Sequence, residues 1–131
     1  VRESLRRLLE TYSDLDVVGE AATAGDALRL CEARIPDVLL LDLYLPDMDG
    51  LSATRTIKTR VPEVNIIVFD NILSPEVEIL AREAGAWDYV HKLEITGGQL
   101  YESMTRALRA TSSQRRMRQA GASSARPKPA T

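Results

Sequence analysis

The chain has 131 residues, of which 44% are hydrophobic, with 17 basic and 19 acidic side chains, and that length suffices for one domain with a buried core. A single cysteine, Cys31, excludes an internal disulfide, and a single histidine, His91, excludes sites that need several thiolate or imidazole ligands. We find no apolar run long enough to cross a bilayer and no signal peptide, and therefore expect a cytoplasmic globular protein.

The charge is unevenly distributed along the chain. Residues 111–131 carry five basic side chains and no acid, which leaves a net charge of −7 on residues 1–110. The basic segment is rich in small and polar residues, so about its last fifteen residues are expected to be disordered. We therefore predict a domain over residues 1–110, followed by a basic linker or tail over residues 111–131. A contact with nucleic acid is the alternative role for that tail.

The first third of the chain predicts a helix, a short strand and a second helix. Apolar residues recur at helical spacing over residues 2–12, and residues 16–21 are a strand candidate. Thr23 is a suitable N-cap for a helix that ends before Pro36. Cys31 lies among apolar neighbours in that helix, where packing is the expected role of its thiol.

Two apolar runs follow, and each is closed by an acid. Residues 38–41 are four apolar residues followed by Asp42, and residues 64–69 are followed by Asp70. Short runs without polar alternation are typical of strands that are covered on both faces. Residues 51–59 between them are predicted to form a helix.

The remaining elements are marked by local start and stop signals. Ser74 and Pro75 favour a helix start and Gly85 suits its end, while residues 88–90 are a brief strand. Thr96 is the predicted cap of a last helix. The apolar residues that share one face of this last helix are Leu100, Met104, Ala107 and Leu108.

Alternating strands and helices predict a parallel sheet with helices on both sides, in which ligands gather at the carboxyl ends of the strands. Asp42, Asp70 and Lys92 are the charged residues at those ends. Such an arrangement suits phosphoryl transfer to a carboxylate nucleophile, with an ammonium and Mg²⁺ stabilising the developing charge. The pattern alone leaves equally open a plain salt bridge between Asp42 and Lys92 at the rim of the sheet.

Three segments of the sequence resemble segments of one known protein family. The segment PDVLLLDLYLPDMDG at residues 36–50 resembles the phosphoacceptor segment of a bacterial response-regulator receiver domain, and residues 17–22 and 85–92 look like its second and fifth strands. The likeness covers about residues 1–110 and is closest to two-component regulators of the nitrate-response or quorum-sensing type, which usually carry a C-terminal helix-turn-helix. It implies a flavodoxin-like, doubly wound parallel sheet.

The resemblance also implies roles for individual residues. Asp42 would accept a phosphoryl group from a sensor histidine kinase, and Lys92 would contact the phosphate. Tyr44 would offer its backbone carbonyl to Mg²⁺, and Tyr89 would occupy the aromatic switch position, three residues before Lys92. The implied partners are a second copy, bound through the fourth helix, fifth strand and fifth helix, and DNA, bound only through an effector domain outside this chain. No membrane partner is implied.

The chain departs from the family at its start. The first strand of the family, which ends in an acidic pair that binds Mg²⁺, would precede Val1 and is absent from this sequence. Either the sequence is a fragment or the strand is lost, and Mg²⁺ is expected only if the acidic pair exists in the full protein. The missing strand is the central one, so its loss predicts a gap in the sheet, with poor solubility or a partner filling the gap.

A second departure is Asp70, because the family places Thr or Ser there. A carboxylate cannot donate a hydrogen bond to a phosphoryl oxygen. We expect Asp70 to repel the incoming group or to pair with Lys92 and withdraw it from Asp42; the alternative is that its side chain points to solvent. Leu93 in place of the frequent proline carries little weight, since relatives of this type commonly lack it.

The leading hypothesis is therefore a phospho-accepting receiver domain that controls transcription. The alternative is a pseudo-receiver that acts through protein contacts or dimerisation without phosphorylation. We expect a regulatory module rather than an enzyme, since no second nucleophile, glycine-rich phosphate loop or histidine–carboxylate pair supports a hydrolase. His91 is expected to be structural rather than a phosphohistidine.

Overall fold

Among the residues that the structure describes, three parallel strands form a sheet: β1 (Val38–Asp42), β2 (Asn65–Asp70) and β3 (Asp88–His91), in the order β1-β2-β3. The computed structural model describes residues 7, 9–13, 19–71, 74–91, 98 and 100–111. The two acid-closed apolar runs and the brief third segment are therefore strands, as predicted. Their parallel pairing confirms the predicted sheet.

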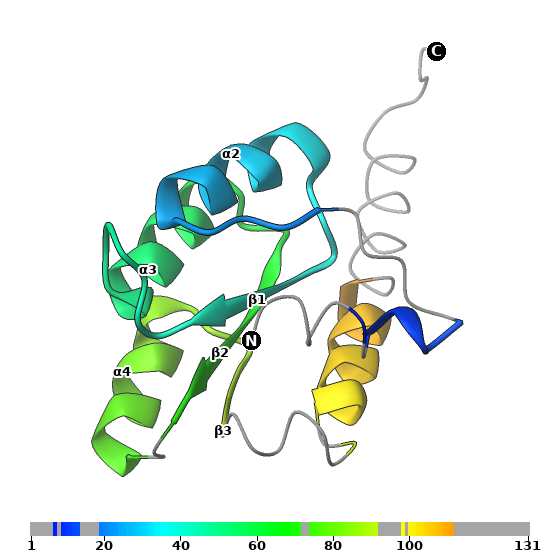
Figure 1. Ribbon diagram of the computed structural model, residues 1–131. Coiled ribbons are helices and arrows are strands. Elements are labelled where there is room, and N and C mark those ends of the chain that lie inside the picture. Colours follow the sequence, from blue (N-terminus) through cyan, green and yellow to red (C-terminus); the bar gives the residue numbers. More distant parts are fainter. Residues whose placement is uncertain are drawn as a thin grey trace, which may run out of the picture.

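Helices precede, connect and follow the described strands. They are α2 (Ala24–Arg34), α3 (Gly50–Arg60) and α4 (Pro75–Ala84), and residues 100–111 form a further helix, here called the C-terminal helix. Figure 1 shows the C-terminal helix on the opposite side of the sheet from α3 and α4. The doubly wound arrangement predicted from the sequence is thus present in the described residues.

The local start and stop signals act as expected. The Thr23 side chain accepts a hydrogen bond from the backbone of Asp26 at the start of α2, and Ser74 caps α4 with Pro75 in its first turn. Gly85 ends α4 with φ at 109°, in the left-handed region that glycine adopts without a steric penalty.

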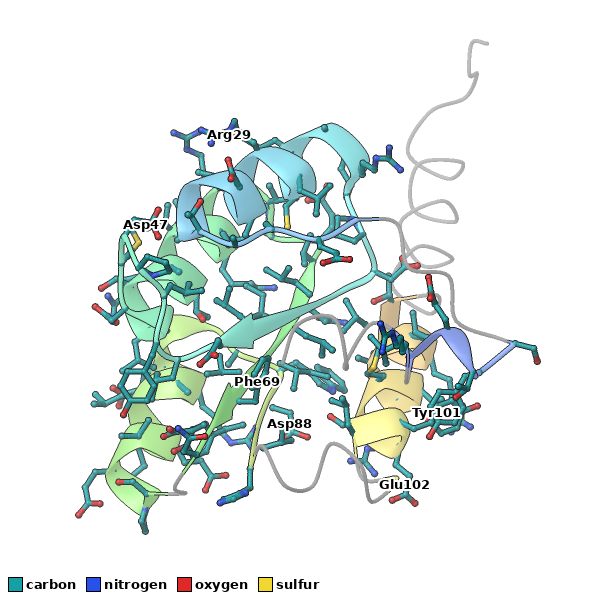
Figure 2. The ribbon with its side chains drawn as sticks, viewed as in Figure 1. Arg29, Asp47, Phe69, Asp88, Tyr101 and Glu102 are labelled. Atoms are coloured by element: carbon teal, nitrogen blue, oxygen red, sulfur yellow. The ribbon has the colours of Figure 1, made fainter. Side chains whose placement is uncertain are left out.

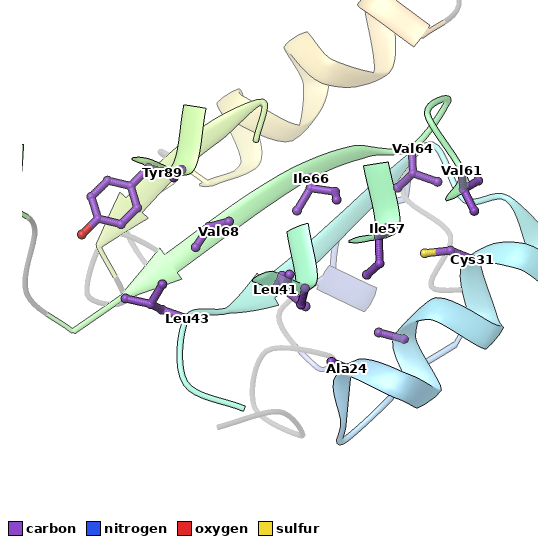
Figure 3. Close-up of a cluster of buried hydrophobic side chains, with 13 residues drawn as sticks. Ala24, Cys31, Leu41, Leu43, Ile57, Val61, Val64, Ile66, Val68 and Tyr89 are labelled. Atoms are coloured by element: carbon purple, nitrogen blue, oxygen red, sulfur yellow. The ribbon is translucent and has the colours of Figure 1, made fainter. Parts of the chain in front are cut away.

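The core is divided between the two faces of the sheet, because successive side chains of a strand alternate. Every residue of β2 is buried. The face toward α2, α3 and α4 buries a cluster that includes Cys31, Leu41, Ile57, Ile66, Val68 and Ala81, most of which Figure 3 labels. The opposite face packs Ile67, Phe69 and Val90 against Leu9, Leu100 and Met104. The packing role predicted for Cys31 is confirmed, and burial raises the pKa of its thiol to about 11.

The amino-terminal predictions need correction. Arg7, Leu9 and Glu10 are helical, but a turn begins at Thr11, so the predicted helix stops short of residue 12. Residues 19–21 are not in a strand; the rest of that strand candidate, residues 16–18, lies outside the described residues. The predicted gap between the second and third strands of the family fold therefore stays a prediction.

The carboxyl-terminal boundary also differs from the expectation. Thr111, assigned above to the tail, is helical and only 2% exposed. Its hydroxyl accepts a hydrogen bond from Asn65 Nδ2 at 2.9 Å, and the same amide nitrogen donates to Ala107 O at 3.2 Å. A buried amide at the start of β2 is thus bonded to the last described turn of the C-terminal helix, so Thr111 packs with the domain.

Candidate functional site

The register of the sheet brings the two acids that close the apolar runs to one edge. Asp42, the last residue of β1, pairs with Phe69, and Asp70, the last residue of β2, pairs with His91, the last residue of β3. Asp42 and Asp70 are therefore at the same carboxyl edge, as predicted. Lys92 follows His91 in the sequence and lies outside the described residues, so its predicted proximity to Asp42 stays a prediction.

The loop after β1 folds back on the carboxylate of Asp42. Tyr44 N–H donates to Asp42 Oδ1 at 3.0 Å, and Tyr44 forms an isolated antiparallel bridge with Asp49. Gly50 closes the loop by donating its N–H to Leu43 O. A Cβ at Gly50 would lie 2.6 Å from Leu43 Cα and 2.7 Å from Asp42 O, so only glycine fits this close approach. The half-buried Asp42 is thereby held at the rim by its own loop.

Two further acids of this loop anchor it to two different helices. Asp47 accepts hydrogen bonds from the backbone N–H groups of Ala24 at 2.9 Å and Gly25 at 3.1 Å, at the amino end of α2. Figure 2 labels Asp47 beside that end of α2. Asp49 caps α3 by accepting from the Ser52 amide at 2.9 Å and its hydroxyl at 2.8 Å.

These anchors also affect the acidity of both carboxyl groups. The Ala24 amide, followed by that of Gly25, lowers the pKa of Asp47, and the Ser52 amide lowers the pKa of Asp49. Sequence reasoning assigned no role to either acid. For Asp49 a local signal existed, since Asp directly before a predicted helix is a preferred N-cap. For Asp47 none did, because its partners lie more than twenty residues away in the sequence.

Asp70 has a partner that the sequence did not reveal. Tyr89 donates its phenol hydroxyl to Asp70 Oδ2 at 2.8 Å, and the Asn71 amide donates to Asp70 Oδ1 at 2.7 Å. Asp70 is only 4% exposed, so the alternative that its side chain points to solvent is wrong. The physical reason is that β2 is the central strand of the described sheet, and a carboxylate there is buried and takes neighbouring donors. Pairing of Asp70 with Lys92 involves a residue outside the described ones.

Tyr89, the predicted switch residue, is buried, and its hydroxyl both donates and accepts a hydrogen bond. Besides donating to Asp70, its oxygen accepts the N–H of Ser74, the N-cap of α4, at 3.2 Å. Burial, and then the hydrogen bond to Asp70, raise the pKa of the phenol to about 12. Figure 3 shows the ring at the end of the buried cluster that is farthest from Cys31.

The donors present are compatible with part of an Mg²⁺ site. A carboxylate at Asp42 and a carbonyl at Tyr44 are the hard oxygen ligands that Mg²⁺ prefers, and this ion commonly keeps several waters. Among the residues that the structure describes, no group of three or more His, Cys, Asp or Glu side chains is placed to hold a metal ion. The assignment of Asp42 and the Tyr44 carbonyl as two Mg²⁺ ligands stays a prediction.

The arrangement defines a class of protein: a doubly wound parallel α/β domain with a half-buried acid at the carboxyl rim of its sheet. The response regulator receiver domain family matches residues 1–105, and the chain belongs to that family. Within the described ranges, no helix has the length and hydrophobicity that crossing a membrane requires.

Two curated proteins are similar to this chain in sequence. The chain is 44% identical over 89 residues to the transcriptional regulatory protein YhcZ of Bacillus subtilis, covering 68% of this chain and 42% of that protein. It is 34% identical over 92 residues to the response regulator VraR of Staphylococcus aureus, covering 70% of this chain and 44% of VraR. The chain thus spans less than half the length of these curated relatives.

Solved structures agree with the family assignment. A two-component response regulator of the LuxR family from an Aurantimonas species is 31% identical with a TM-score of 0.69, over 88% of this chain and 89% of that one. A CheY-like receiver domain protein from Methanospirillum hungatei is 27% identical with a TM-score of 0.76, over 86% and 87%. The flavodoxin-like fold class expected from the sequence is confirmed.

Proposed function

We propose that this chain is the phospho-accepting receiver domain of a two-component transcriptional regulator and that Asp42 is the phosphoacceptor. The observation that carries the proposal is the position of Asp42 at the carboxyl rim of a parallel sheet, half-buried and oriented by the Tyr44 amide. Such rims are where ligands of open α/β sheets bind. Membership of the receiver family supports the same role.

The chemistry required of Asp42 is simple. An oxygen of its carboxylate attacks the phosphorus of a phosphohistidine, a new P–O bond forms as the P–N bond breaks, and the imidazole leaves and takes up a proton. Lys92 is proposed to pair with a phosphoryl oxygen and to offset the added charge. Mg²⁺, where present, supplies further neutralisation of charge, with Asp42 and the Tyr44 carbonyl among its ligands.

The proposed partners follow from the family and its named relatives. A sensor histidine kinase supplies the phosphoryl group to this chain in the cytoplasm, and the chain acts on transcription through an effector domain outside residues 1–131. Two of the similar proteins are a transcriptional regulatory protein and a LuxR-family response regulator, which supports this output. Homodimerisation is proposed through the surface formed by α4, β3 and the C-terminal helix.

One observation favours a second candidate, a pseudo-receiver that acts by protein contact without phosphorylation. Asp70 occupies the rim position where the family resemblance expects a hydroxyl, and its carboxylate is engaged by Tyr89. A carboxylate near Asp42 adds negative charge where an anionic phosphoryl group would arrive. The two candidates differ in whether Asp42 is ever modified.

The deciding experiment uses the full-length protein with Mg²⁺ and acetyl phosphate, read by intact mass and peptide mapping. We expect one phosphoryl mass gain, located at Asp42 and absent in Asp42→Asn. Asp37→Asn is the matched control, because Asp37 lies just before β1, at the opposite end of the strand from Asp42. The absence of any mass gain in the unsubstituted protein, also with a sensor kinase as donor, would overturn the proposal in favour of the pseudo-receiver.

A further inference from the structure

Three elements meet at the hydroxyl of one buried tyrosine. Tyr89 comes from β3, its hydrogen-bond acceptor Asp70 ends β2, and its hydrogen-bond donor Ser74 is the N-cap of α4. Asp70 and Tyr89 are both almost fully buried. We call Asp70, Tyr89 and the Ser74 amide the Tyr89 latch.

The chemistry of Asp70 determines the direction of its hydrogen bond with Tyr89. A carboxylate has no proton to donate, so the phenol proton must point at Asp70. The phenol oxygen then presents its lone pairs to the Ser74 N–H, whose bond to it is 3.2 Å long. A threonine at position 70 could either donate to or accept from Tyr89, whereas an aspartate allows only one orientation.

The latch extends into the first turn of α4. The Ser74 hydroxyl accepts the amide of Val77 at 3.4 Å and donates to Glu76 at 3.0 Å, so the same residue joins Tyr89 to the helix start. A hydrogen bond to a charged acceptor is stronger than one between neutral groups and is costly to break when buried. The start of α4 is therefore tied to β3 through Tyr89, and through Tyr89 to Asp70 at the end of β2.

We propose that Asp70 is a positioning residue that holds Tyr89 and the start of α4 in one arrangement, whether or not Asp42 carries a phosphoryl group. The surface of α4 and β3 then keeps the same arrangement at all times, because the hydrogen bond from Tyr89 to Asp70 forms without a phosphoryl group. The statement that this arrangement is independent of phosphorylation rests on the proposed function, whereas the Tyr89 latch itself does not. The expected consequence is that a partner bound to this surface recognises the unmodified protein.

The first test is hydrogen exchange of the Ser74 amide in the full-length, unmodified protein. Tyr89→Phe removes one oxygen and keeps the ring, and should accelerate this exchange by about tenfold, since the amide loses its acceptor. Asp70→Asn keeps one acceptor oxygen and should give a smaller acceleration. Glu83→Gln, at an exposed carboxyl group of α4, is the matched control and should leave the exchange unchanged. Unchanged exchange in Tyr89→Phe would overturn the latch.

The second test compares the same amide before and after treatment with Mg²⁺ and acetyl phosphate, with the mass gain measured on the same sample. In phosphorylated protein, exchange at Ser74 should stay within about twofold of the untreated value, because the charged acceptor is already in place. A larger change would refute the constitutive arrangement. If no mass gain occurs, the proposed function fails, and the first test alone decides on the latch.

Discussion

Replacing Tyr89 with phenylalanine isolates one hydroxyl group whose contribution to stability can be worked out from its hydrogen bonds. The substitution leaves the buried Asp70 carboxylate without the donor at 2.8 Å and the Ser74 amide without its acceptor at 3.2 Å. The loss of a hydrogen bond to a charged group costs about 1.5–3 kcal/mol. We expect the free energy of unfolding at pH 8 to fall by that amount, with no cavity contribution because the ring is retained.

The raised pKa of Tyr89 determines how this contribution depends on pH. Burial and the hydrogen bond to Asp70 raise the pKa from 10.0 to about 12, so ionising the phenol in the folded protein costs up to about 2.7 kcal/mol, at about 1.36 kcal/mol per pH unit. The folded state holds the proton more tightly than the unfolded state does. This contribution to stability is therefore complete below pH 10 and is lost as the pH rises toward 12. At pH 11 the loss amounts to about 1.4 kcal/mol.

Urea unfolding of the wild type and Tyr89→Phe at pH 8 and pH 11 measures both quantities. The difference in unfolding free energy should be about 1.5–3 kcal/mol at pH 8 and smaller by about 1.4 kcal/mol at pH 11. Tyr44→Phe is the control for the loss of a phenol, because Tyr44 is 67% exposed. A difference that does not change with pH, or one below about 0.5 kcal/mol at pH 8, would refute the reasoning.

Three further predictions concern the site and the core. Asp70→Thr should raise the fraction of Asp42 phosphorylated by acetyl phosphate about threefold to tenfold, because it removes a negative charge from the rim; an unchanged time course by intact mass would show that the carboxylate has no influence there. Cys31, with its pKa raised to about 11, should react with a thiol reagent at pH 8 only as fast as the protein unfolds, and fast labelling under native conditions would contradict its burial. Ile57→Ala, at a side chain 1% exposed, should lower the unfolding free energy in urea by about 2–5 kcal/mol, whereas Leu80→Ala, at an exposed side chain, should change it by less than about 0.5 kcal/mol. Equal effects of the two alanine substitutions would contradict the assignment of the core.

Features set by short stretches of chain could be predicted from the sequence. Thr23 and Ser74 cap helices because their side chains accept backbone N–H groups three residues ahead, a relation visible in the sequence itself. The acid-closed apolar runs were identified as strands because burial on both faces leaves no alternation. Their carboxyl ends meet at one edge because parallel strands require it, so the neighbourhood of Asp42 and Asp70 was also predictable.

The hydrogen-bond partner of Asp70 could not be predicted, because it depends on the register between β2 and β3. Tyr89 lies opposite Val68, two residues before Asp70, so Tyr89 and Asp70 project from the same face of the sheet. A sequence does not state this register, and a one-residue slip would place the two side chains on opposite faces. The same limit applies to Asp47, whose partners at the start of α2 are neighbours only in the folded chain.

The anchoring of the β1–α3 loop has a mechanical consequence. Asp47 accepts a hydrogen bond from the first turn of α2, and Asp49 accepts one from the first turn of α3. The stretch from Leu43 to Asp49 is therefore fixed to two helices at once. The same stretch contains Tyr44, whose amide orients Asp42, so a displacement of either helix is expected to act on that carboxylate. A ligand that only ever touches the outer surface of α2 could therefore change the reactivity of Asp42 without coming near it.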